Sequence, residues 1–163
     1  MRAMLNAAAA LIWLTAAVCC ARADERWAAY VNDRFGTSLS YPADVFVVQP
    51  PPENDDGRTL VAFNGAKILV FAGYNVDNET LASKRASLTG NDYAQIAYNA
   101  TGKTWFVVSG HRAIGGVDSI FYEKYIVSTA SETIHNLIIT YPAKSKAAYD
   151  PLVARIAASF AGP

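Results

Sequence analysis

The stretch RTLVAFNGAKILVFAGY, residues 58–74, decides what kind of fold this chain can form. Two apolar runs flank Asn64-Gly65, a pair of residues that tolerate positive φ and so favour the tight turn of an antiparallel hairpin. β-branched and aromatic residues dominate both runs, as they do in strands. The stretch therefore predicts two paired strands, at 58–63 and 66–74.

Most of the remaining chain is also typical of strands. WAAYV (27–31) and TSLSY (37–41) flank a turn-rich link and predict a second hairpin. Pro42 should end its strand or lie at a sheet edge, because it has no N–H to donate to a neighbour. Similar runs, separated by turn residues that include Gly115-Gly116, predict further strands at DVFVVQ (44–49), YAQIAYN (93–99), KTWFVVSG (103–110), DSIFYEKYIVS (118–128) and TIHNLIITY (133–141).

Two segments have helical patterns instead. NETLASKRASL (78–88) offers Asn78 as an N-cap, and Gly90 should end the helix. From about Lys146 to Phe160, apolar residues recur at three- and four-residue steps, and Pro151 should lie in the first turn. Those residues are Tyr149, Leu152, Val153, Ile156, Ala157 and Phe160. The prediction is an α+β domain: an antiparallel sheet of roughly eight strands flanked by two helices, which should cover one face.

The N-terminus has the pattern of a cleaved signal peptide. An uncharged run over residues 3–21 leads to Ala21-Arg22-Ala23, the small-x-small pattern that signal peptidase accepts. We expect residues 1–23 to be removed after Ala23, which leaves 24–163 as a single periplasmic or secreted domain. A transmembrane anchor is the alternative for a run of this length, and lipidation at Cys19 or Cys20 is another.

Charge and cysteine content then exclude several functions. Loss of Arg2 and Arg22 leaves 12 basic residues of the original 14 against 14 acidic ones, a net charge of about −2. Neither nucleic-acid binding nor an electrostatic membrane surface is expected, because both need a concentrated basic field and no run of like charge is present. Stable membrane insertion after signal removal is not expected either. The expected mature chain has no thiol, so disulfides, thiolate metal sites and cysteine nucleophiles are excluded.

An acidic cluster, Glu53 to Asp56, follows three prolines and precedes Gly57. If Gly57 is the sixth residue of a calcium loop, Pro52 becomes the first and Phe63 the twelfth, and neither can bind a cation. We therefore expect Asp56-Gly57 to form a turn between strands, with Arg58 tying the loop by an ion pair. A weak cation site at Asn54–Asp56 remains the alternative.

Candidate catalytic groups are few. Ser109, His111 and Asp118 lie close in sequence, but Gly-x-Ser-x-Gly is absent and a turn at the end of a strand explains them more simply. His135 should lie on the polar side of a strand or hydrogen-bond to a neighbour, and two histidines without metal-ligand spacing argue against zinc. Paired carboxylates would have to come from Asp77, Glu79, Asp92, Glu123 or Glu132. No catalytic residue, metal site or cofactor is assigned.

Aromatic residues are the most distinctive feature of the later strands. In SIFYEKYIV (119–127), Phe121 and Tyr125 alternate with Tyr122, so both faces of this strand should carry aromatic side chains. Either structure covers both faces, or an aromatic patch is exposed to a ligand or partner. The candidate surface is Tyr98, Trp105, Tyr122 and Tyr125.

Three motifs carry a family resemblance: RFGTSLSYPADVF (34–46), Trp105 to Gly110, and the closing YDPLVARIAASF (149–160). They resemble a group of uncharacterised secreted bacterial proteins, which is in turn similar to the PsbP-like fold. That fold is shared by the extrinsic subunit of the oxygen-evolving complex and a Ran-binding nuclear-import factor. The resemblance covers residues 26–160 and implies a sheet flanked by helices, with members that bind other proteins and perform no chemistry. It also implies that Asn54 to Arg58 is a structural signature.

These observations favour an exported, non-enzymatic binding or accessory protein with a protein or small-molecule partner. A small hydrolase that uses Ser109 with His111 or His135 is one alternative. An inhibitor-like envelope protein that acts through the loop at residues 50–56 is another.

Overall fold

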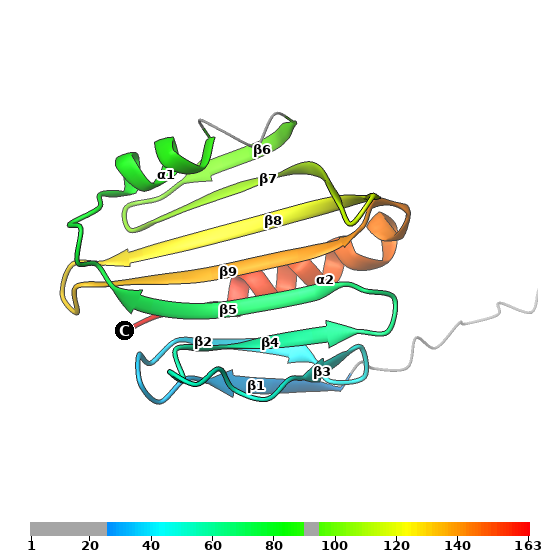
Figure 1. Ribbon diagram of the computed structural model, residues 1–163, viewed down its shortest axis with the longest axis horizontal. Coiled ribbons are helices and arrows are strands. Elements are labelled where there is room, and N and C mark those ends of the chain that lie inside the picture. Colours follow the sequence, from blue (N-terminus) through cyan, green and yellow to red (C-terminus); the bar gives the residue numbers. More distant parts are fainter. Residues whose placement is uncertain (1–25, 90–94) are drawn as a thin grey trace, which may run out of the picture.

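The computed structural model describes residues 26–89 and 95–163, which form an α+β fold built on one large antiparallel sheet (Figure 1). The strands of this sheet lie in the order β3-β4-β5-β9-β8-β7-β6. Their bounds are β3 Phe46–Val48, β4 Gly57–Ala62, β5 Lys67–Tyr74, β6 Ile96–Thr101, β7 Trp105–Ile114, β8 Val117–Ser128 and β9 Thr133–Pro142. A two-stranded sheet pairs β1 (Trp27–Val31) with β2 (Ser38–Pro42). The proposed signal peptide, the expected helix end at Gly90 and the first two residues of the strand expected at 93–99 lie outside the described residues.

Both predicted hairpins are confirmed. Strands β4 and β5 pair antiparallel around Asn64-Gly65, where Gly65 has φ 86° and its N–H donates to the Ala62 carbonyl. Only a residue without a Cβ adopts this backbone freely. Pro42 is the last residue of β2, as expected of a residue that cannot donate to a ladder.

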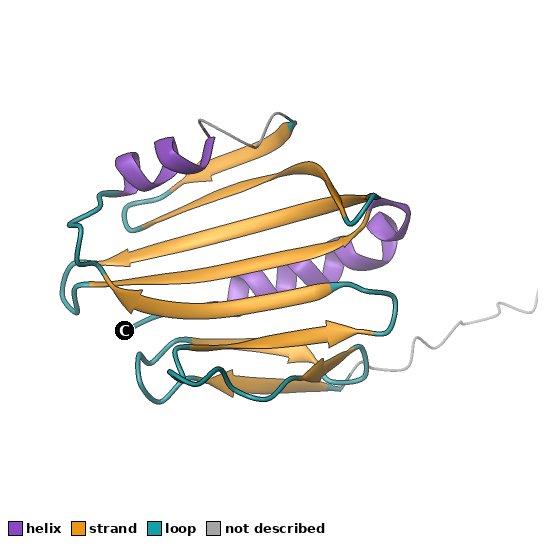
Figure 2. Ribbon diagram, viewed as in Figure 1, coloured by secondary structure: helices purple, strands orange, loops and turns teal. Residues whose placement is uncertain are grey.

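The two helices lie on opposite faces of the large sheet, so the expectation that they share one face is wrong. Helix α2 (Lys146–Ser159) passes behind the sheet in the view of Figure 2, whereas α1 (Leu81–Thr89) lies at the end formed by β6 and β7. Ile120 packs in the cluster that contains α2, while Phe121 packs in the cluster that Leu81 contacts. Successive residues of a strand point to opposite faces, so β8 contributes side chains to the clusters under both helices.

Helix α2 supplies much of the larger core. Its apolar stripe from Tyr149 to Phe160 is buried as predicted. It follows a short 3₁₀ turn, η1 (Ala143–Ser145), and begins at Lys146, so Pro151 lies beyond the first turn. The expected position of this proline was therefore wrong. In the described part of the chain, no helix is long and apolar enough to span a bilayer.

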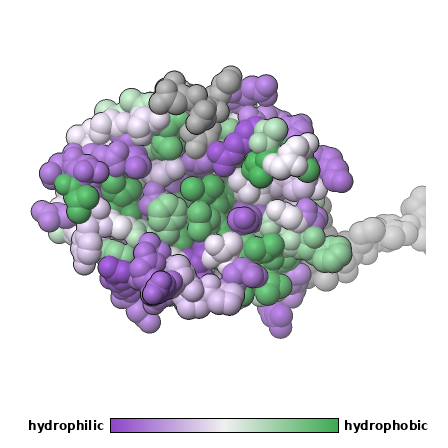
Figure 3. Space-filling view, viewed as in Figure 1, coloured by the Kyte–Doolittle hydropathy of each residue, from purple (hydrophilic) through white to green (hydrophobic). Residues whose placement is uncertain are grey.

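The opposite face is covered only in part. Figure 3 shows this face, with apolar side chains gathered at its centre over β5, β9 and β8. Leu69, Phe71 and Ile138 point to this side and are half-buried. Helix α1 lies beside β6 and β7, where Arg85 donates to the side chains of Asn99 and Thr101.

Helix α1 begins later than the sequence suggests. Thr80 caps it: the Ser83 N–H donates to Thr80 Oγ1 at 3.1 Å, and the Thr80 N–H donates to Ser83 Oγ at 2.9 Å. Asn78, the expected N-cap, instead has φ 52° within a preceding turn. Asparagine tolerates this left-handed backbone better than most residues, which explains its presence there.

The acidic loop is a tight corner, but its turn is not at Asp56-Gly57. The Asp55 N–H donates to the Pro52 carbonyl at 3.0 Å, and Gly57 is the first residue of β4. The predicted ion pair is confirmed, with Arg58 Nη1 3.2 Å from Asp55 Oδ1. Arg34 also donates to the Asn54 carbonyl, so cationic side chains hold the loop from two sides.

Candidate functional site

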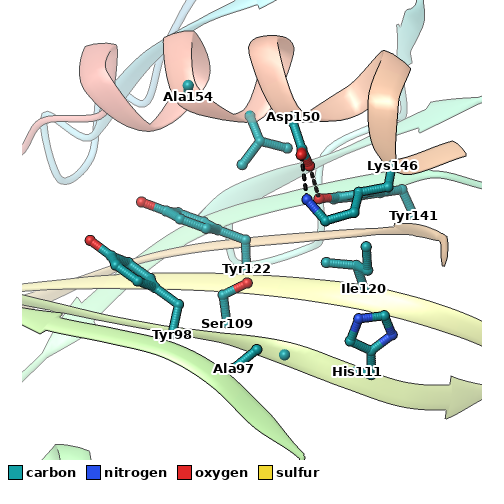
Figure 4. Close-up of a pocket in the computed structure, with 12 residues that line it drawn as sticks. Ala97, Tyr98, Ser109, His111, Ile120, Tyr122, Tyr141, Lys146, Asp150 and Ala154 are labelled. Atoms are coloured by element: carbon teal, nitrogen blue, oxygen red, sulfur yellow. Dashed lines mark hydrogen bonds and ion pairs between the residues drawn. The ribbon is translucent and has the colours of Figure 1, made fainter.

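A cleft opens between the N-terminal half of α2 and the strands β6, β7 and β8. It has a volume of about 290 Å³. Strand residues form its floor, and α2, with Ala154, lies above them as its wall (Figure 4). Its lining comprises Ala97, Tyr98, Ser109, Gly110, His111, Ile120, Tyr122, Tyr141, Lys146, Asp150, Val153 and Ala154. We call this site the α2 cleft.

Two tyrosines dominate the floor of the α2 cleft. Tyr98 of β6 is opposite Ser109 of β7, and Ser109 is opposite Tyr122 of β8, so the three residues form one row across the sheet. Figure 4 shows the two rings projecting in the same direction, with Ser109 near their bases. Tyr98 is 55% exposed and Tyr122 is half-buried. Within the described residues neither hydroxyl has a hydrogen-bond partner.

Burial changes the acidity of Tyr122. Burial, with a smaller contribution from the charge of a Tyr98 phenolate, raises the pKa of Tyr122 to about 12. Removing a phenolate from water is unfavourable, so the ring stays neutral through the physiological range. Tyr122 therefore offers the cleft a neutral hydroxyl.

The charged groups at the rim are paired with each other. Asp150 accepts from Lys146 Nζ through Oδ2 and from the Tyr141 hydroxyl through Oδ1, the latter at 3.1 Å. Burial, followed by the Asp150 charge, raises the pKa of Tyr141, which keeps this donor protonated. The i,i+4 spacing of Lys146 and Asp150 brings the two side chains together on one side of α2.

The four aromatic residues expected to form a surface lie in three places. Tyr98 and Tyr122 are together in the α2 cleft. Trp105 is on the same face but lines a separate hollow, where Lys124 Nζ lies 5.7 Å from its ring centroid. Tyr125 is on the opposite face, is 4% exposed and stacks on Phe106 at 4.9 Å.

Ser109 and His111 both line the α2 cleft, but they do not form a catalytic pair. Ser109 Oγ donates to the Phe121 carbonyl at 2.7 Å. His111 Nδ1 lies 3.5 Å from Asp118 Oδ1 instead. A serine nucleophile needs a base that accepts its proton, and the described residues place none beside Ser109.

His135 is buried in β9 rather than exposed in a cleft. Its Nδ1 lies 2.7 Å from Thr37 Oγ1 and its Nε2 lies 2.9 Å from Thr133 Oγ1. The expected hydrogen bond to a neighbour is confirmed. Burial lowers the pKa of His135, so the ring is neutral and structural.

Of the candidate acidic residues, Glu79 and Glu132 line one hollow beside the start of α1, away from the α2 cleft, and Glu123 is buried elsewhere. Glu123 is 1% exposed; its Oε1 lies 3.2 Å from Arg112 Nη1, and its Oε2 accepts from the Tyr125 hydroxyl at 2.7 Å. Glu79 pairs with Lys84 at 2.9 Å. Asp92 lies outside the described residues. Over residues 26–89 and 95–163, no three His, Cys, Asp or Glu side chains are grouped so that they could hold a metal ion.

Sequence reasoning missed the helical wall of the cleft. Lys146 and Asp150 have the spacing of a helical ion pair, and Ala154 is an exposed small residue directly after buried Val153. These signals identify one side of a helix. Only the packing of α2 over the sheet shows that this side faces Tyr98 and Tyr122.

Comparison with solved structures shows what this architecture resembles. The cyanobacterial PsbP (CyanoP) of Synechocystis sp. PCC 6803 matches with TM-score 0.62 and 9% identity, over 89% of this chain and 97% of that one. The Ran-binding protein Mog1p of Saccharomyces cerevisiae matches with TM-score 0.59 and 13% identity, over 84% and 95%. No protein-family model and no curated protein sequence matches the chain. The chain has a PsbP-like fold. At 9% and 13% sequence identity, the similarity shows the fold alone.

Proposed function

We propose that this chain is an exported, non-enzymatic binding or accessory protein, and that the α2 cleft receives a protein partner. The observation that carries the proposal is the pair of tyrosines, Tyr98 and Tyr122, which line the cleft with hydroxyls that have no partner within the described residues; Tyr98 is 55% exposed and Tyr122 is half-buried. Tyrosine is enriched at protein interfaces because it combines apolar contact area with a polar tip.

The hydrogen bonding around Ser109 supports binding over hydrolysis. Its hydroxyl already donates to a backbone carbonyl, and the nearby His111 is directed to Asp118. The fold also includes a protein described as Ran-binding, which is consistent with a role in recognising another protein.

Export rests on the N-terminal sequence. The pattern Ala21-Arg22-Ala23 favours cleavage after Ala23 and a periplasmic or secreted domain that starts at Asp24. Mass spectrometry of the protein recovered from the envelope or medium tests this step. A mass that begins at Asp24 supports export, whereas an intact Met1 in the cytosolic fraction contradicts it.

Two substitutions on α2, each of which replaces an alanine by tryptophan, test the binding site. Ala154→Trp fills the cleft from its helical wall, whereas Ala148→Trp adds the same ring at an exposed position outside it. Tagged protein and both variants are used to capture partners from native envelope extract, with quantification by mass spectrometry. We expect a partner to be retained by the unmodified protein and Ala148→Trp, and lost by Ala154→Trp. Equal capture by the two variants would exclude the α2 cleft as the binding surface.

A further inference from the structure

We propose that the α2 cleft recognises one neutral aromatic side chain of its partner polypeptide, held between the rings of Tyr98 and Tyr122. This inference deepens the proposed function and rests on it. It follows from the row that Tyr98, Ser109 and Tyr122 form across three adjacent strands.

The spacing of this row suits a single inserted ring. Neighbouring strands lie about 4.8 Å apart, so Tyr98 and Tyr122 are separated by about 10 Å at their backbones. A planar ring with carbon contacts of about 3.5–4 Å on each side needs roughly 7–8 Å. Tyr98 is 55% exposed, so a small rotation of its side chain can close the remaining gap.

Ser109 keeps the space between the two rings open. It is the smallest side chain of the row, and its hydroxyl is drawn down onto the Phe121 carbonyl at 2.7 Å. Ser109 itself lines the cleft and is half-buried, so the cleft reaches down between the tyrosines. A larger residue at position 109 would occupy the place of the inserted ring.

The charge of the site selects a neutral group. The charged side chains in the lining, Lys146 and Asp150, are already paired with each other, and His111 Nδ1 lies 3.5 Å from Asp118 Oδ1 outside the lining. A guanidinium or carboxylate placed here would lose water without gaining an unpaired counter-charge, which is costly. An aromatic ring has no such cost, and an indole N–H or phenol O–H could bond to a free tyrosine hydroxyl at the rim.

The volume indicates a side chain rather than a whole ligand. Small-molecule pockets span about 300–1,000 Å³ and enclose most of the ligand. The α2 cleft, at about 290 Å³, lies at the lower limit and has room for one ring system. A cleft of this size fits a ring whose attached backbone lies outside it, as the backbone of a partner chain would.

Capped tripeptides test the inference in isolation from any native partner. Acetyl-Gly-Trp-Gly-amide and acetyl-Gly-Leu-Gly-amide are titrated into ¹⁵N-labelled protein, and amide shifts around Tyr98, Ser109 and Tyr122 are followed by NMR. We expect the tryptophan peptide to bind there and the leucine peptide to bind about tenfold more weakly, since aromatic stacking adds to simple apolar contact. Tyr98→Leu and Tyr122→Leu should each weaken tryptophan binding about fivefold. Tyr74→Leu, at an exposed tyrosine outside the cleft, should leave it unchanged.

Four results would overturn the inference. Equal affinity for the tryptophan and leucine peptides would show that the space between Tyr98 and Tyr122 does not select aromatic rings. Amide shifts that occur away from Tyr98, Ser109 and Tyr122 would place the bound peptide outside the space between the two tyrosines. Unchanged tryptophan affinity in both Tyr98→Leu and Tyr122→Leu would do the same. Free indole is titrated in the same way. Binding of indole without binding of the tryptophan peptide would identify a small molecule, and not a side chain, as the ligand. In each case a partner lost with Ala154→Trp would still support the cleft as the binding site, so the two proposals fail separately.

Discussion

The imidazole Nδ1 of His135 in β9 lies 2.7 Å from the hydroxyl oxygen of Thr37, next to β2, so one buried contact joins the small sheet to the large one. The second ring nitrogen is 2.9 Å from Thr133 Oγ1. A neutral imidazole has one donor and one acceptor nitrogen, and each finds a hydroxyl here. Protonation would convert the acceptor nitrogen into a donor inside a region that excludes water.

We predict that stability depends on pH through His135. Burial lowers the pKa of His135 in the folded protein below the 6.5 of an ordinary histidine. As pH falls through 6.5 the unfolded chain gains this proton before the folded chain does, so stability falls by up to about 1.4 kcal/mol per pH unit until the folded pKa is reached. Urea unfolding at pH 7.5, 6.5 and 5.5 measures the slope. The dependence of the unfolding free energy on pH should be weaker in His135→Gln and unchanged in His111→Asn. The same slope in both variants would contradict the assignment to His135.

Gly57→Ala should destabilise the sheet. A Cβ at Gly57 would lie 2.2 Å from the Val70 carbonyl oxygen and 2.5 Å from Phe71 Cβ, so β4 and β5 would have to separate. We expect a loss of about 2–3 kcal/mol in the free energy of unfolding, measured with urea. Gly73→Ala in β5 is the matched control, because a Cβ there has no neighbour within 4 Å. Similar losses for both would refute the close approach at Gly57.

The turns before and after β4 show which features a local stretch of sequence predicts and which it does not. Asn64-Gly65 was located correctly because its signal is local: positive φ between two apolar runs. Asp56-Gly57 gives a similar local signal, but the reason for a glycine at position 57 lies on another strand. The carbonyl of Val70 in β5 leaves no room for a Cβ there. A contact between strands depends on their register, which a single stretch of sequence does not contain.

Glu123→Leu should destabilise the protein by about 2–3 kcal/mol, because it removes the acceptor of the Arg112 guanidinium and of the Tyr125 hydroxyl. Thermal and urea unfolding measure the loss. Asp44→Asn is the comparison, since the Arg26–Asp44 pair is largely exposed and should contribute less than about 1 kcal/mol. An equal effect of the two substitutions would count against a buried role for Glu123.

Thr80→Ala should destabilise α1 by about 1 kcal/mol, because the Ser83 N–H loses its side-chain acceptor. Asn78→Gly tests the other candidate cap: at φ 52° glycine is tolerated at least as well as asparagine, so stability should hold or rise slightly. Urea unfolding of both variants gives the comparison. A larger loss for Asn78→Gly than for Thr80→Ala would restore Asn78 as the cap.

The candidate site could be predicted only in part for a similar reason. The alternation in β8 places Tyr122 and Tyr125 on opposite faces, and the structure shows them there. Alternation does not say which face stays accessible. Tyr125 is stacked on Phe106, whereas Tyr122 lines the cleft beside α2. The cleft depends on where a helix from the end of the chain packs, and no local pattern specifies that.

Site-specific photocrosslinking in the native cell tests the binding role of the α2 cleft most directly. A benzophenone side chain is placed at position 154, in the cleft wall, or at position 148, on an exposed part of the same helix. We predict a defined adduct from position 154 that weakens with Tyr98→Leu and Tyr122→Leu, and none from position 148. Adducts from position 148 alone, or identical adducts from both positions that ignore the tyrosine substitutions, would contradict binding in the cleft.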